Sequence, residues 1–103
     1  MTFGQIISEA RKQANLSQKE LAARVKKEDG QPISPQYLND IERDRRNPPS
    51  DFLIEQFASI LNIPPEFLYF QAGELPADIK DIEADSEQVV NAFKAFRKSL
   101  RGN

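Results

Sequence analysis

The side chains that could do chemistry in this sequence are concentrated in residues 34–46. Leu38 and Ile41 are the clear core positions there, and their three-residue spacing is that of one helix face. The other side chains are mainly amide, hydroxyl, carboxyl and guanidinium groups: Gln36, Tyr37, Asn39, Asp40, Arg43, Arg45 and Arg46. Amides can hydrogen-bond base edges in the DNA major groove, and guanidinium groups can bind phosphates. We therefore interpret this stretch as a DNA recognition helix with a basic end.

Capping signals place this helix and a second one before it. Ser17 and Glu20 have the spacing of a capping box, in which each side chain satisfies a free N–H at a helix start. An apolar stripe at helical spacing follows, formed by Leu21, Ala22 and Val25. Ser34 and Pro35 supply a hydroxyl N-cap and a first-turn proline to the recognition helix. The sequence thus predicts two helices joined by a polar turn.

Composition restricts the chemistry that the chain can perform. Its 103 residues include no Cys and no His, which excludes disulfides, thiol nucleophiles, most zinc sites and histidine acid–base catalysis. Because no pair of carboxylates is marked for acid–base work either, we expect no enzymatic activity and no cofactor. No apolar run approaches the roughly 18 residues of a membrane helix, and no signal-peptide pattern is present. We expect a soluble cytoplasmic protein with no membrane partner.

The net charge of −2 is unfavourable for a DNA-binding protein, but the charges are unevenly distributed. Residues 1–50 hold nine Lys/Arg and seven Asp/Glu, whereas residues 51–103 hold five Lys/Arg and nine Asp/Glu. The basic excess therefore lies in the half that contains the recognition helix. The acidic excess lies mainly in residues 74–87, away from it.

Helical periodicity continues on both sides of the helix pair. Residues 2–14 form an amphipathic first helix, and residues 51–62 form a fourth, whose predicted buried side is Phe52/Leu53, Phe57, Ala58 and Leu61. Pro64-Pro65 begins a short fifth helix that ends near Gly73. An acidic linker follows, expected to pack only at Leu75, Ile79 and Ile82, and then a last helix over residues 86–100. We therefore expect a DNA-binding domain in residues 1–73 and a linker with a C-terminal helix in residues 74–103.

Several motifs coincide in residues 3–70. They are ARKQANLSQKELA, a Ser-x-x-Tyr-Leu-x-x-Ile-Glu run, a proline soon after it, and a fourth helix ending in LNI. In this combination the sequence resembles the Cro/phage-repressor (lambda-repressor-like, Xre-type) helix-turn-helix family. The resemblance implies an all-α fold, a five-helix lambda-repressor-like helix-turn-helix domain, here followed by a C-terminal helix.

The resemblance also implies roles for individual residues. In the family, a glutamine at the start of the second helix binds a phosphate and braces the recognition helix, a position held here by Gln18. An arginine late in the first helix pairs with a glutamate near the end of the third, matching Arg11 and Glu42. Gln36 and Asn39 have the side-chain type that contacts adenine through two hydrogen bonds. The full set of expected DNA-binding residues is Ser17, Gln18, Ser34, Gln36, Tyr37, Asn39, Asp40, Arg43, Arg45 and Arg46.

Three features depart from the family pattern. The turn between the second and third helices, Lys26–Ile33, is about six residues longer than usual and either extends the second helix or forms an extra surface that touches DNA. Asp44 stands where the family favours glycine, and we predict a positive φ there because Asp tolerates the left-handed region better than most residues. Pro35 removes one customary base contact and leaves Gln36 as the main amide reader.

Asp40 either accepts a hydrogen bond from cytosine N4 or only pairs with an arginine.

The function implied is that of a sequence-specific transcriptional regulator, a repressor of phage or bacterial type that binds a near-palindromic operator in double-stranded DNA as a homodimer. The expected dimer interface joins aromatic side chains of the fifth helix to the apolar stripe of the last helix: Phe67, Phe70, Val89, Phe93, Phe96 and Leu100. That stripe could instead dock on its own domain.

Two other functions stay open. The first is an antitoxin-like or protease-controlled regulator whose C-terminal segment, residues 74–103, binds a protein partner. The second is a helical adaptor with no role on DNA. Salt-sensitive DNA binding would exclude the adaptor, and a toxin-like or protease gene beside this one would favour the first alternative.

Overall fold

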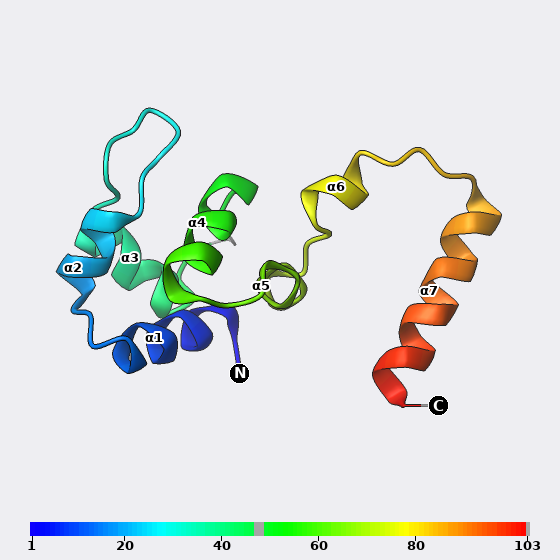
Figure 1. Ribbon diagram of the computed structural model, residues 1–103, viewed down its shortest axis with the longest axis horizontal. Helices are drawn as coiled ribbons and strands as arrows, with labels where there is room; N and C mark the ends of the chain where they lie inside the picture. Colours follow the sequence, from blue (N-terminus) through cyan, green and yellow to red (C-terminus); the bar gives the residue numbers. More distant parts are fainter. Residues whose placement is uncertain (47–48, 103) are drawn as a thin grey trace.

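The computed structural model describes residues 1–46 and 49–102, which form helices joined by turns (Figure 1). The helices are α1 (Phe3–Gln13), α2 (Gln18–Arg24), α3 (Pro35–Glu42), α4 (Asp51–Leu61), α5 (Pro65–Ala72), α6 (Ala77–Lys80) and α7 (Ser86–Arg101). The predicted all-α architecture of five helices and a C-terminal helix is confirmed, and α6 is a short addition within the linker. None of the helices in the described ranges is long and apolar enough to span a membrane.

Local side-chain caps explain where most of the helices begin and end. Capping boxes open α1, α2 and α7 and are formed by Thr2–Gln5, Ser17–Glu20 and Asp85–Gln88. Ser34 and Ser50 cap α3 and α4 through their hydroxyl oxygens. Helices α4 and α5 end at residues in the left-handed conformation, Asn62 and Gly73. The chain thus carries its own start and stop signals for each long helix.

Helices α1–α5 and the ends of the α2–α3 connection enclose one hydrophobic core. Its buried side chains are Phe3, Ile6, Ile7, Leu21, Ala22, Val25, Ile33, Leu38, Ile41, Leu53, Ile54, Phe57, Ala58, Leu61, Leu68 and Tyr69. The prediction that Phe52 faces this core is wrong, because its side chain is 44% exposed. Leu53, Ile54 and Phe57 define the buried stripe of α4, and Phe52 lies to one side of it.

The long connection between α2 and α3 is a hairpin and does not extend α2. Lys26 pairs with Pro32 in an isolated antiparallel bridge, and the Ile33 N–H donates to the Val25 carbonyl at 2.9 Å. Gln56 of α4 holds the base of the hairpin, since its amide exchanges hydrogen bonds with the backbone N–H and C=O of Lys26. The hairpin is therefore anchored where it leaves the core, and its tip projects from the domain (Figure 1).

Helix α1 meets the end of α3 at Gly4, where the two backbones approach closely. A methyl group on the Gly4 Cα would lie 2.4 Å from the Ile41 carbonyl oxygen and 2.8 Å from Oδ1 of Asp44. Asp44 has the predicted positive φ, +57°, and its carboxylate accepts hydrogen bonds from the Gly4 N–H at 2.9 Å and the Thr2 hydroxyl at 2.5 Å. A carboxylate is also favourable beside the positive end of the α1 dipole. Asp44 thus ties the loop behind α3 to the start of α1.

Gly4→Ala is expected to lower the free energy of unfolding by about 1–3 kcal/mol, because the added methyl group must push α1 away from α3. Urea denaturation followed by circular dichroism measures the change. Glu9→Ala, on the exposed side of the same helix, is the control and should change stability by no more than about 0.5 kcal/mol. Equal stability of Gly4→Ala and the wild type would show that the two helices separate at little cost.

Residues 77–102, which we call the arm, lie outside the core. Every side chain of the arm is exposed. The prediction that the linker packs on the domain through three apolar side chains is therefore wrong, since all three are about half exposed or more: Leu75, Ile79 and Ile82. Helix α6 is held at the surface by charge instead, because the Lys80 ammonium lies 3.0 Å from Glu74 and 3.2 Å from Asp51. The hydrogen bonds to Glu74 and Asp51 raise the pKa of Lys80.

Helix α7 stands at the end of the molecule opposite α2 and α3 (Figure 1). It contacts the domain through Phe96, whose ring lies edge-on to that of Phe70 in α5, with 6.2 Å between the ring centroids. Its apolar stripe is otherwise open to solvent, with exposed fractions of 42–60% for Val89, Val90, Phe93, Phe96 and Leu100. The stripe predicted for this helix is thus present and is not covered by the domain.

Candidate nucleic-acid interface

Helix α3, the predicted recognition helix, is short and sharply bounded. At its start, the Tyr37 N–H donates to the Ser34 hydroxyl oxygen at 3.0 Å. It ends at Glu42, earlier than the polar pattern suggests, because Asp44 turns the backbone into the left-handed region. Residues 45–46 therefore lie in a loop beside the helix end, fixed through the bonds of Asp44 to α1.

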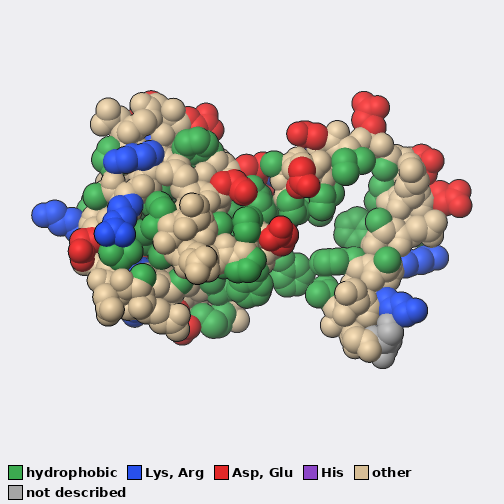
Figure 2. Space-filling view, viewed as in Figure 1, with side chains coloured by type: hydrophobic (Ala, Val, Ile, Leu, Met, Phe, Trp, Pro, Cys, Tyr) green, Lys and Arg blue, Asp and Glu red, His purple; other side chains and the backbone are tan. Residues whose placement is uncertain are grey.

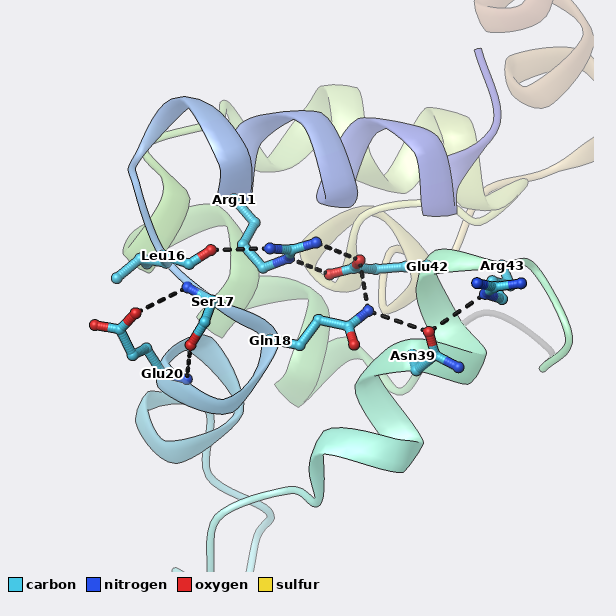
Figure 3. A network of polar contacts seen from close by, with 8 residues as sticks. All are labelled: Arg11, Leu16, Ser17, Gln18, Glu20, Asn39, Glu42 and Arg43. Atoms are coloured by element: carbon cyan, nitrogen blue, oxygen red, sulfur yellow. Dashed lines mark hydrogen bonds and ion pairs between the residues drawn. The ribbon is translucent and has the colours of Figure 1, made fainter.

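A buried ion pair joins α1 to α3 (Figure 3). The Arg11 guanidinium donates from Nε to Oε2 of Glu42 at 2.7 Å and from Nη2 to Oε1 at 3.0 Å. A third bond runs from Nη1 to the Leu16 carbonyl at 2.9 Å, just before α2 begins. The two charged side chains are only 11% and 4% exposed. A fully hydrogen-bonded pair of this kind fixes the relative positions of α1, α3 and the start of α2.

Gln18 connects α2 to α3 at the same point. Its Nε2 donates to Oε1 of Glu42 at 3.0 Å and to Oδ1 of Asn39 at 3.2 Å. The Asn39 oxygen also accepts a hydrogen bond from Nε of Arg43 at 3.3 Å (Figure 3). These bonds form a continuous chain from the buried ion pair to the surface of α3.

A second polar cluster covers the outer side of α3. Gln36 donates from Nε2 to Oδ1 of Asp40 at 3.1 Å. Asp40 also lies 3.9 Å from Nη1 of Arg45 and 3.7 Å from Nε of Arg46. The Arg46 guanidinium stands over the Tyr37 ring, 5.1 Å from its centroid. Asp40 thus pairs with both loop arginines and holds the Gln36 amide beside them.

The start of α2 lies next to Asn39, since Gln18, the first residue of α2, is hydrogen-bonded to it. Ser17 accepts the Glu20 N–H at 3.0 Å, and its own N–H donates to the Glu20 carboxylate at 2.9 Å. The hydrogen bond from the Ser17 backbone lowers the pKa of Glu20 below its ordinary value. A helix N-terminus of this kind, with its positive dipole end and free N–H groups, can bind a phosphate.

The structure brings the expected DNA-binding residues onto one side of the domain, along α3, its following loop and the start of α2. The residues expected at a dimer interface lie at the other end, on α5 and α7. Sequence reasoning missed two supports, the bonds of Asp44 to α1 and of Gln56 to the hairpin. The Thr2–Gln5 spacing signals the capping box at the start of α1. No sequence pattern, however, links Asp44 to the start of α1 or Gln56 to the hairpin.

Comparisons with known proteins agree with this geometry. The family model HTH_3, described as a helix-turn-helix, matches residues 7–68. A solved structure of the SinR protein/SinI protein complex has a chain that is 25% identical to this one. The alignment covers 97% of this chain and 92% of that chain, with a TM-score of 0.55. No curated protein sequence matches the chain significantly.

Proposed function

Because this chain belongs to the HTH_3 helix-turn-helix family and therefore to the DNA-binding transcription regulators, we propose that it is a sequence-specific repressor of phage or bacterial type. It binds a near-palindromic operator as a homodimer and acts in the cytoplasm, where that DNA lies. The observation that carries the proposal is the polar side of α3, where two amides project from a helix braced to α1 and α2 and three arginines follow at the helix end and in the next loop.

In this proposal α3 lies in the major groove, and its amide side chains contact base edges. Arg43, Arg45 and Arg46 contact phosphates or flanking bases, and the N-terminus of α2 at Ser17 and Gln18 binds a phosphate. Selection of binding sites from genomic DNA fragments with the purified protein tests the function. We expect an enriched near-palindrome whose half-sites are about one helical turn, roughly 34 Å, apart.

Arg45→Ala and Arg46→Ala are each expected to weaken binding to the operator and to random DNA alike, and to reduce the salt slope by about 1. Gln36→Ala should instead lose about 1–3 kcal/mol of discrimination at one base position. Fluorescence anisotropy over a series of salt concentrations measures both effects. Lys94→Ala, which removes a cation from α7, is the control and should leave the slope unchanged. Equal losses on operator and random DNA for Gln36→Ala would remove Gln36 from the base-reading set.

The arm supports the homodimer part of the proposal. Hydrophobic side chains of the domain and of the arm face each other across an open gap in Figure 2. Phe67 and Phe70 on the domain side are 45% and 52% exposed, and the stripe of α7 is exposed to a similar degree. Apolar surface of this extent is seldom left in water, and a two-fold axis would let the same surface of a second copy cover it.

A second candidate function uses the same surface for a different protein. The chain aligned with this one belongs to a complex of two proteins, SinR and SinI, so a protein partner for residues 74–103 is the favoured alternative. Analytical ultracentrifugation of the purified protein distinguishes the homodimer from the partner-protein alternative. A monomer at micromolar concentration would favour a partner protein, and a dimer would favour self-association.

A further inference from the structure

The hydrogen bonds around α3 determine which atoms of its two outward amides are free to contact DNA. We propose that this network gives Asn39 and Gln36 different base preferences. Asn39 presents donors alone and selects guanine, whereas Gln36 keeps one donor and one acceptor and reads adenine. The inference rests on the proposed DNA-binding function and specifies part of the operator that this function requires.

The orientation of the Asn39 amide follows from the chemistry of its partners. A guanidinium group can only donate, so the Asn39 atom that Arg43 Nε contacts at 3.3 Å is the oxygen. Gln18 Nε2 donates to the same oxygen at 3.2 Å, and the Glu42 carboxylate, which only accepts, keeps that Gln18 nitrogen in place at 3.0 Å. Both lone pairs of Asn39 Oδ1 are therefore occupied. In Figure 3 the Asn39 nitrogen points away from these bonds, and its two N–H donors have no hydrogen-bond partner within residues 1–46 and 49–102.

These free donors cannot make the usual amide contact with adenine. That contact requires the amide oxygen to accept from adenine N6 while the nitrogen donates to N7. The Asn39 oxygen has no lone pair left for it. Guanine presents two acceptors, N7 and O6, at the major-groove edge, and both can accept from one NH₂ group. Guanine therefore replaces adenine as the base expected opposite Asn39.

Gln36 is held differently and keeps its capacity to read adenine. Its Nε2 donates one hydrogen to Oδ1 of Asp40 at 3.1 Å, and a carboxylate fixes this orientation because it can only accept. The second N–H and the oxygen have no partner in the part of the chain that the structure describes, and the side chain is exposed. One free donor beside one free acceptor is the pair that adenine N7 and N6 require. Asp40 and Arg43 thus act as positioning residues, each through the amide that it orients.

The first experiment reads the two base positions directly. Wild-type protein, Asn39→Ala and Gln36→Ala are each used to select sites from a randomised DNA duplex, and the position at which each variant loses discrimination is identified. We expect guanine at the Asn39 position, preferred over adenine by roughly 10- to 100-fold, and adenine at the Gln36 position. Replacing that guanine with 7-deazaguanine, which lacks the N7 acceptor, should weaken wild-type binding and leave Asn39→Ala unaffected.

The second experiment releases the Asn39 oxygen. Arg43→Leu frees one lone pair of Oδ1, so the preference for guanine over adenine at that position should fall by about tenfold. Arg45→Leu is the matched control, because it removes the same charge without a bond to Asn39 and should leave the guanine-to-adenine ratio unchanged. Both arginines are exposed, so neither change disturbs the core.

The possible failures are distinguishable. If the wild type enriches no sequence at all, the proposed function is wrong and this inference falls with it. If an operator is enriched but adenine stands opposite Asn39, or Asn39→Ala loses discrimination nowhere, only the inference is overturned. An unchanged guanine-to-adenine ratio in Arg43→Leu also overturns it and leaves the proposed function intact.

Discussion

Replacing Arg11 with alanine is expected to lower the free energy of unfolding by about 3–5 kcal/mol. The reason is the state in which Glu42 is left, because its side chain is only 4% exposed and its two strongest hydrogen bonds come from Arg11. Gln18 would be the remaining partner of a buried carboxylate. Since a small domain is stable by about 5–15 kcal/mol in total, this loss is a large share. Urea and thermal denaturation followed by circular dichroism measure it.

Two controls separate the buried charge from general damage to α1. Lys12→Ala changes the next, exposed residue of the same helix and should alter stability by no more than about 0.5 kcal/mol. Arg11→Met combined with Glu42→Leu removes both charges and keeps apolar volume, so it should recover most of the loss. A melting temperature of Arg11→Ala equal to that of the wild type would show that water solvates Glu42 and that the pair contributes little.

The same pair links stability to the amide network that we propose reads DNA. Glu42 Oε1 accepts from both Arg11 and Gln18, and Gln18 in turn fixes the oxygen of Asn39. Loss of Arg11 should therefore disturb the amide network even at temperatures where the domain stays folded. The contribution of the charge pair is therefore the geometry that it imposes on α1, α2 and α3 more than the stability that it adds.

The fold could be predicted from the sequence because its signals are local. Ser17 with Glu20, Ser34 with Pro35, and Gly73 mark helix ends within a few residues, and the structure has helices bounded at these points. The positive φ at Asp44 was predictable because the family favours glycine at this position and Asp tolerates the left-handed region. Each of these features depends on backbone groups within one helical turn, so no knowledge of the tertiary fold was needed.

Features that depend on distant partners could not be predicted in this way. The carboxylate of Asp44 reaches the start of α1, and Gln56 reaches the hairpin, across long sequence separations. The orientation of the Asn39 amide depends on Gln18 and on Arg43 together, so residue type alone does not show which atoms of that amide are already hydrogen-bonded.

The linker shows a related limit of sequence patterns. Ile79 and Ile82 are apolar and were expected to pack on the domain, yet they are 47% and 64% exposed. An apolar residue in a sequence indicates surface that must be covered, but it does not say whether its own chain or another covers it. The sequence therefore predicted the apolar stripe of α7, but only the structure shows that the domain does not cover it.

Replacing both Phe93 and Phe96 with alanine is expected to raise the dimer dissociation constant by at least about 100-fold. Each substitution removes an aromatic side chain from the open stripe. Truncating an aromatic residue at the centre of an interface commonly costs about 2 kcal/mol or more of binding free energy. The five-helix domain should keep its stability, because neither side chain belongs to its core. Operator affinity should fall in parallel, since a monomer can bind only one half-site. Sedimentation equilibrium and fluorescence anisotropy measure the two effects on the same samples.

The matched control for this prediction lies on the opposite side of α7. Lys94→Ala combined with Lys98→Ala changes two exposed charged residues of the same helix and should leave the dimer constant within a factor of about 3. Truncation after Asp78 removes the whole of α7 and should weaken dimer and operator binding at least as much as the double aromatic change. If the Phe93→Ala, Phe96→Ala double variant dimerised as tightly as the wild type, the stripe would be a binding surface for another protein. The fall in operator affinity would then be absent too, because self-association through α7 is what couples the two measurements.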